Sequence, residues 1–188
     1  MVRSLSHVIG FDDAPFPAQH HGDVLVVGAV YSAERLDGVL SGKVRRDGVN
    51  STQTLIRLIT ASRFFPHTQL LMLQGIALAG FNVVDLHHLY QATGIPVLVI
   101  ARRAPNFTAI KKALLNRVPG GRRKWALIER AGPPELVAGI YIQRVGLPLA
   151  VAEATIRRFA IHSIIPEPLR TAHIIAGGVV GGGSRQRV

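Results

Sequence analysis

The chain has 188 residues, 48% of them hydrophobic, which is enough for one domain with a sizeable core. Its formal net charge of +11 and its sequence pI of about 11.4 favour an anionic partner, nucleic acid first. The absence of cysteine excludes disulfides, thiolate metal sites and thiol nucleophiles, and no apolar run is long enough to span a bilayer. With no cleavable signal at the N-terminus, we expect a cytoplasmic protein.

The N-terminal third predicts three antiparallel strands. The first strand covers residues 7–11 and is followed directly by two carboxylates, Asp12 and Asp13. The other two strands cover residues 24–31 and 36–45. A charge at the end of a buried strand is expensive to desolvate unless it is paired, hydrogen-bonded or bound to a cation. Either the two aspartates merely begin a turn before Ala-Pro, or Asp12 points off the strand and holds a divalent metal.

The middle of the chain predicts helices alternating with buried strands. A helix capped at position 50 or 51 ends near residue 65, and the apolar run 69–74 is typical of a strand covered on both faces. Gly75 and Gly80 allow close backbone approach at the end of this strand, where open α/β sheets place ligands. Asn82 is expected to cap a helix through residue 92, before a strand over residues 96–101.

The C-terminal third predicts a short basic helix over residues 107–115 and a mobile Gly/Arg loop over residues 118–124. Two strands are expected over residues 125–130 and 140–145, and a helix over residues 148–159. In the last helix, residues 165–176, the spacing of Leu169, Ala172, His173 and Ala176 places His173 on the buried face. We expect one domain over residues 1–177 and a flexible Gly/Arg tail over residues 178–188.

Four residues of metal-binding types occur at the ends of core elements. Asp12 ends the first strand, Asp47 opens the first long helix, Gln74 ends the fourth strand and His173 faces inward from the last helix. Hard cations such as magnesium prefer a few oxygen ligands, completed by water and phosphate, and could act on a phosphodiester. Each residue also has a purely structural explanation: a turn at Asp47, a backbone contact for Gln74, and a satisfied core histidine.

Three common catalytic or nucleotide-binding motifs are absent. No Gly-x-Gly-x-x-Gly opens a helix after the first strand, no P-loop lysine is present, and no Gly-x-Ser-x-Gly elbow occurs. Dinucleotide and nucleoside triphosphate sites are therefore not expected.

Three long motifs resemble a known family. The segments IGFDDAPF (residues 9–16), GIALAGFNVVD (75–85) and IPEPLRTAHIIA (165–176) are similar, in the same order, to the archaeal endonuclease dU family, a relative of endonuclease V. The resemblance covers nearly the whole chain. It implies an α/β, ribonuclease H-like fold with a mixed central sheet, three antiparallel N-terminal strands and flanking helices.

The resemblance also implies the site. Asp12 corresponds to the catalytic aspartate that ends the first strand, and Asp47 takes the place of a catalytic glutamate. Gln74 replaces a metal-binding carboxylate, Arg102 stands where endonuclease V has a lysine, and His173 closes the last motif. The implied catalytic residues are Asp12, Asp47, Gln74, Arg102 and His173, with Asp12, Asp47 and Gln74 as ligands of Mg²⁺ (or Mn²⁺).

The function implied is a metal-dependent endonuclease that acts in DNA repair on DNA containing deaminated bases, deoxyuridine by the family name, with RNA as the alternative substrate. The residues expected to contact nucleic acid are Gly75, Gly80, Arg102, Arg103, Lys111, Lys112 and Arg170. Because Gln74 brings no charge to the metal, a protein that kept the fold and nucleic-acid binding but weakened the reaction is the alternative. A structural or small-anion-binding α/β domain is the third reading.

Overall fold

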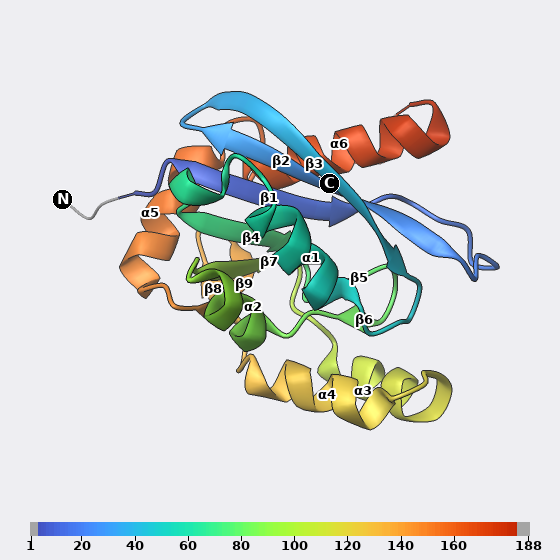
Figure 1. Cartoon of the computed structure of the whole chain (residues 1–188). Helices are drawn as coiled ribbons and strands as arrows, with labels where there is room; N and C mark the ends of the chain where they lie inside the picture. The colour runs from blue at the N-terminus through green and yellow to red at the C-terminus, as the bar shows by residue number, and fades with distance from the viewer. Residues whose placement is uncertain (1–3, 184–188) are drawn as a thin grey trace.

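The computed structural model describes residues 4–183, which form a central sheet with helices on both faces (Figure 1). The elements in chain order are β1 (His7–Asp13), β2 (Asp23–Ser32), β3 (Arg35–Arg45), α1 (Ser51–Thr60), the 3₁₀ turn η1 (Phe65–His67), β4 (Leu70–Gln74), β5 (Ala77–Leu78), β6 (Asn82–Val83), α2 (Leu86–Thr93), β7 (Val97–Ala101), α3 (Phe107–Arg117), α4 (Gly121–Arg130), β8 (Glu135–Val137), β9 (Ile140–Val145), α5 (Leu149–Phe159) and α6 (Glu167–Gly181). Within residues 4–183, no helix combines the length and apolar character needed to cross a membrane.

Seven strands form one mixed sheet in the order β3-β2-β1-β4-β7-β9-β8. The first three strands pair antiparallel, β4 runs parallel to β1, and β7 runs parallel to β4. The predicted mixed central sheet, with its three antiparallel N-terminal strands and flanking helices, is confirmed. Because β1, β4 and β7 are parallel, their carboxyl ends meet at one edge of the sheet, where Asp12, Gln74 and Ala101 lie.

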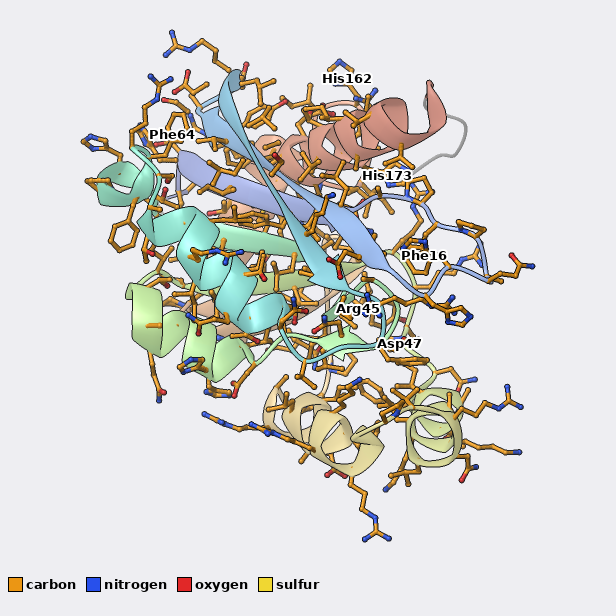
Figure 2. The ribbon with its side chains drawn as sticks, turned by 45° about the vertical axis from the view of Figure 1, so that its right-hand side comes forward. Phe16, Arg45, Asp47, Phe64, His162 and His173 are labelled. Carbon is orange, nitrogen blue, oxygen red and sulfur yellow. The ribbon has the colours of Figure 1, made fainter. Side chains whose placement is uncertain are left out.

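One face of the sheet is covered by α1 and α2. Side chains such as Phe11 and Leu73 pack there against Leu55 and Ile59 of α1, all of them buried. Phe64, beyond the end of α1 (Figure 2), lies against β3, since a Cβ at Gly38 would come within 2.4 Å of its ring. The apolar alternation along each strand fixes which side chains share this face.

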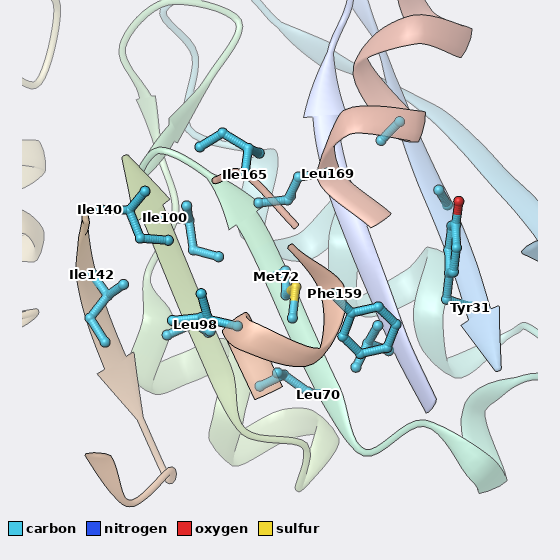
Figure 3. Packing of buried hydrophobic residues seen from close by; sticks show 14 of the residues in the cluster. Tyr31, Leu70, Met72, Leu98, Ile100, Ile140, Ile142, Phe159, Ile165 and Leu169 are labelled. Carbon is cyan, nitrogen blue, oxygen red and sulfur yellow. The ribbon is translucent and has the colours of Figure 1, made fainter. Parts of the chain in front are cut away.

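The other face is covered by α5 and α6. Figure 3 shows Met72 and Leu98 of the sheet together with Phe159 of α5 and Leu169 of α6. Gly10 lets α6 approach β1 closely, because a Cβ there would lie 2.5 Å from the Pro168 carbonyl carbon. The close approach matters for function, since it brings the α6 side chains down onto the end of β1.

The prediction for residues 118–130 is wrong. The structure has no loop followed by a strand there; Gly121–Arg130 is helix α4. The buried residues of α4, Gly121, Lys124 and Ile128, recur at i, i+3 and i+7, which is a helical spacing. The glycines and arginines at the start of this segment concealed that pattern.

Three further boundaries differ from the predictions. Asn82 does not cap a helix but forms the short strand β6, and Asp85 caps α2 by accepting the His88 N–H at 3.0 Å. Helix α1 ends at Thr60, and the turn η1 follows before the next strand. Helix α6 continues to Gly181, so the first part of the predicted tail is helical, whereas residues 184–188 of that tail lie outside the described residues.

Candidate functional site: the carboxyl edge of the central strands

Asp12 and His173 form a direct side-chain contact at the end of β1. His173 Nδ1 lies 2.8 Å from Asp12 Oδ2, and Asp12 Oδ1 accepts the backbone N–H of Asp13 at 2.9 Å. Asp12 is 4% exposed and the His173 side chain 23%, so His173 is only partly on the buried face that its spacing predicted. In the tautomer that carries its proton on Nδ1, the His173 ring donates this hydrogen bond to the Asp12 carboxyl oxygen.

Gln74 is the neighbour of Asp12 across the parallel pair β1–β4. The register pairs Phe11 with Leu73, so the next residues on the two strands, Asp12 and Gln74, lie side by side and face α6. Gln74 Oε1 is buried and has no hydrogen-bond partner within residues 4–183. A buried acceptor without a partner is costly, and a bound water, ligand or cation would satisfy it.

Asp13 points to the opposite face of the sheet from Asp12. Its Oδ2 accepts the backbone N–H of Ala79 at 2.7 Å. Burial, followed by the nearby charge of Asp12, raises the pKa of Asp13 from 3.8 to about 6. Asp13 therefore fixes the β5–β6 hairpin, and its charge changes close to neutral pH.

Asp47 holds the same hairpin from the other side. Its N–H donates to Ala79 O at 2.9 Å and its Oδ1 accepts the Phe81 N–H at 2.8 Å. Its backbone is left-handed (φ 52°), a conformation that costs a non-glycine residue energy. Gly80 has no room for a side chain here, because a Cβ would lie 2.6 Å from Asp47 Oδ1. Figure 2 shows Asp47 and His173 at the same end of the sheet.

Lys124 of α4 reaches Asp47 and was not foreseen from the sequence. Its Nζ donates a hydrogen bond to the Asp47 carbonyl oxygen, and the residue is only 2% exposed. Burial lowers the pKa of the Lys124 ammonium, and the Asp47 charge opposes that change. A fully buried lysine is rare unless it is paired. The helical spacing of α4 would have identified it if that helix had been predicted.

The candidate phosphate-binding residues lie around this edge. Arg102 and Arg103 follow β7 and are exposed, as are Lys111 and Lys112 on α3. Arg170 is the exception, because its Nη1 lies 3.4 Å from Glu167 Oε2 in an ion pair on α6. Arg102 and Arg103 are thus presented to solvent directly after the end of β7, and Lys111 and Lys112 are presented to solvent on α3.

Gly75 and Gly80 lie beside a cavity of about 280 Å³. Most of its wall is apolar, including Phe81 of the hairpin and Ile128 of α4, while Arg103 and Gln143 supply polar groups. Its volume is close to the lower end of small-ligand pockets, roughly 300 Å³. Gly75 leaves open space on this side, since no described atom of residues 4–183 lies within 4 Å of a Cβ built there.

The structure divides the predicted metal site into two parts. On the α6 face of the sheet, Asp12 contacts His173 and lies beside Gln74, whereas Asp47 and Asp13 bind the β5–β6 hairpin. Within residues 4–183, no group of three His, Asp or Glu side chains is placed so that it could hold a metal ion. The oxygen donors beside His173 are therefore one carboxylate and one amide.

Comparison with known proteins identifies the relatives of this chain. The family model for endonuclease dU matches residues 4–180. A UPF0215 protein of Deinococcus radiodurans is 60% identical over 185 residues, covering 98% of this chain and 94% of that protein. These matches extend over nearly the whole sequence.

Two solved structures are similar in fold. A protein of unknown function from Archaeoglobus fulgidus superposes with a TM-score of 0.87 at 31% identity, covering 93% of this chain and 98% of the other. Ciona intestinalis endonuclease V, crystallised with DNA containing an inosine, superposes with a TM-score of 0.56 at 14% identity, covering 89% and 82% of the two chains. The second likeness concerns the fold alone.

Proposed function

The chain belongs to the endonuclease dU family, and on that basis we propose that it is a metal-dependent endonuclease that cuts DNA containing deaminated bases, deoxyuridine first. The observation that most supports this proposal is the contact of the buried Asp12 carboxylate with His173, next to Gln74 Oε1, which has no hydrogen-bond partner in the part of the chain that the structure describes. An oriented histidine and two oxygen donors at the open end of parallel strands suit hydrolysis of a phosphodiester. The endonuclease V fold, which in Ciona was crystallised with inosine-containing DNA, is consistent with this substrate class.

The donors present fit a hard cation such as Mg²⁺ or Mn²⁺. Asp12 supplies a carboxylate oxygen, and Gln74 supplies a buried amide oxygen that has no other partner among residues 4–183. Asp47 is the third candidate from the sequence; in the structure its Oδ1 binds the β5–β6 hairpin and its Oδ2 is in an ion pair with Arg46 Nε at 3.4 Å. When bound, the cation would stabilise negative charge on the reacting phosphate.

Residues of the protein itself carry out proton transfer, phosphate binding and base binding in the proposed reaction. Asp12 orients His173 through Nδ1, so that the ring exchanges a proton at Nε2 with the attacking water or the leaving oxygen. Arg102 and Arg103, at the end of β7, hold phosphates of the substrate strand. The cavity beside Gly75 takes a base extruded from the duplex, which is easiest for a damaged, poorly paired base.

A second function is favoured by one observation. Gln74 brings no charge, so metal affinity is lower than with a carboxylate at this position. A nucleic-acid-binding protein with a weakened reaction would bind DNA in a salt-dependent manner and show no effect of metal on strand integrity.

One experiment separates the two functions. Uracil-containing, inosine-containing and undamaged duplexes are incubated with the protein in Mg²⁺, in Mn²⁺ and in EDTA, and strand breaks are measured. The proposal predicts cleavage of a damaged duplex that requires metal. Binding of all three duplexes without cleavage under any condition would support the binding protein instead.

A further inference from the structure

The positive charge of the chain is concentrated in one short segment. Residues 102–130 contain nine of the 22 Lys and Arg residues but only one, Glu129, of the 11 Asp and Glu residues. Most of the +11 net charge therefore lies in and just before the helix pair α3–α4, residues 107–130, which we call the α3–α4 lobe. Six basic side chains of the lobe are exposed: Lys111, Lys112, Arg117, Arg122, Arg123 and Arg130.

These charges are poorly neutralised by the protein itself. Elsewhere exposed arginines meet carboxylates, for example Arg35 with Asp37 at 2.6 Å and Arg157 with Glu153 at 2.8 Å. Within residues 4–183, Arg130 is the one basic residue of the lobe in an ion pair, with Asp85 at 3.6 Å. Crowded like charges destabilise a compact state, and an anionic partner that neutralises them would relieve this repulsion.

The α3–α4 lobe packs against the β5–β6 hairpin, which holds it beside the strand-end site. Leu114 of α3 and Ile128 of α4 are buried together with Val83 of the β5–β6 hairpin. The two helices touch so closely at Gly121 that a Cβ there would overlap the Leu114 carbonyl. Figure 1 shows α3 and α4 side by side, on the opposite side of the molecule from α6. Lys124 adds a hydrogen bond to the Asp47 carbonyl oxygen.

We propose that the exposed basic face of the α3–α4 lobe binds the sugar–phosphate backbone of a nucleic acid away from the scissile phosphate, independently of base sequence. This inference rests on the proposed function and extends it, because it assigns Arg117, Arg122 and Arg123 at the α3–α4 turn to a second contact region. Lysine and arginine contacts to phosphates supply affinity and register but read no sequence.

An anionic membrane surface fits the lobe less well. Surface helices that bind membranes combine basic residues with a broad apolar face that enters the lipid. In the lobe, Leu115 is the large apolar side chain that is strongly exposed within residues 4–183, at 46%. The apolar residues Ile110 and Leu127 pack against the small core of the lobe instead.

The test compares two triple variants that lose the same charge. The lobe variant is Arg117→Gln/Arg122→Gln/Arg123→Gln, and the control is Arg57→Gln/Arg63→Gln/Arg158→Gln, three exposed arginines on or next to α1 and α5. Binding of a labelled undamaged duplex is measured by anisotropy in EDTA, between about 50 and 200 mM salt. Thermal melting checks that both variants are folded.

The proposal predicts that the lobe variant binds the duplex at least about tenfold more weakly than the parent at the upper salt concentration. The slope of log binding constant against log salt concentration should also fall in magnitude by roughly 2 to 3, because each lost phosphate contact removes about 0.9. The control keeps the parental slope. Equal behaviour of the two variants overturns the proposal, and so does parental binding to phosphatidylserine vesicles but not to the duplex.

The outcome is independent of the proposed reaction. Because the assay contains no metal, lobe-dependent binding by a protein that never cuts would uphold this inference and reject the endonuclease function. A protein that cuts damaged DNA but binds equally well without the lobe arginines would uphold the endonuclease function and reject this inference.

Discussion

His173 and Asp12 are 161 positions apart in the chain, yet their side chains are joined by a 2.8 Å contact between Nδ1 and Oδ2. The contact depends on how closely α6 lies on β1. Gly10 lies two residues before Asp12 and on the same face of β1. The backbone of Pro168 packs directly against it, so that no space is left for a Cβ. A side chain at position 10 would therefore push away the helix that provides His173.

Gly10→Ala should destabilise the protein and weaken the site. Its Cβ would lie 2.5 Å from the Pro168 carbonyl carbon, and overpacking of this kind costs typically 1–3 kcal/mol, here about 3 because backbone is the obstacle. Gly178→Ala is the matched control on α6, since no atom of the described part of the chain, apart from the helix's own backbone, lies within 4 Å of a Cβ there. That control should be neutral or stabilising by about 0.5–1 kcal/mol. Urea unfolding measures both, and equal stability of the two variants would contradict the packing assignment.

Asp13→Asn should remove a pH dependence of stability. The folded-state pKa of Asp13 is raised from 3.8 to about 6, so between these values the folded state binds more protons than the unfolded state. Wild-type stability therefore falls as pH rises through this window. Asn keeps an oxygen for the Ala79 N–H but cannot ionise, so at pH 7 the variant should be more stable by about 1–3 kcal/mol.

The measurement is urea unfolding in EDTA at pH values from 4 to 7. The stability difference between Asp13→Asn and the parent should be small at the acidic end and grow toward neutral pH. Asp23→Asn, whose carboxylate is half exposed at the other end of the β1–β2 connection, controls for loss of one negative charge. A difference that is constant with pH would show that Asp13 is not destabilised by its burial.

Gln74→Asp should make stability depend strongly on metal. The new carboxylate would lie beside the buried Asp12, and two adjacent carboxylates repel each other without a cation. The variant should therefore melt below the parent in EDTA and gain more from added Mg²⁺ than the parent does, as ligand binding to the folded state requires. Melting temperatures in both media measure this, and an identical Mg²⁺ response would argue against a cation at this position.

Lys124→Met should impair cleavage more than stability. The change leaves the Asp47 carbonyl without its donor, which costs about 1–3 kcal/mol, but it also removes a buried charge, so the two effects oppose each other. With Asp47 less firmly held, kcat should fall about tenfold or more, as misplacement near a reacting centre can cost up to about 100-fold. Lys112→Met, an exposed change on α3, should alter KM rather than kcat. Parental kcat in Lys124→Met would leave Lys124 with a packing role only.

Much of the fold was accessible from the sequence because its signals are local. Fully apolar runs and strand alternation predicted β1, β2, β3, β4 and β7. The periodicity of the last helix placed Leu169 and Ala172 on its buried side, with His173 beside them. Parallel pairing then brought the ends of β1 and β4 together, so the proximity of Asp12 and Gln74 followed from topology.

The remaining features depend on contacts that no local pattern records. Strands of two residues, such as β5 and β6, have no periodicity, so the hairpin bound by Asp13 and Asp47 was missed. Asn82 resembles a helix cap, but its side-chain Nδ2 donates to the Arg45 carbonyl oxygen and its Oδ1 accepts the Ser51 N–H. In the sequence, Lys124 resembles the other basic residues of a loop. Only the packing of α4 directs its side chain toward Asp47.

The most direct test of the proposed reaction is strand scission of a uracil-containing duplex in Mg²⁺ by the parent, by Asp12→Asn and by His173→Gln, with Asp23→Asn as a matched control. The account predicts that both site variants bind the duplex like the parent but cut at least about 100-fold more slowly, the usual contribution of a positioned proton-transfer group or more. Cleavage by Asp12→Asn at the parental rate would contradict it.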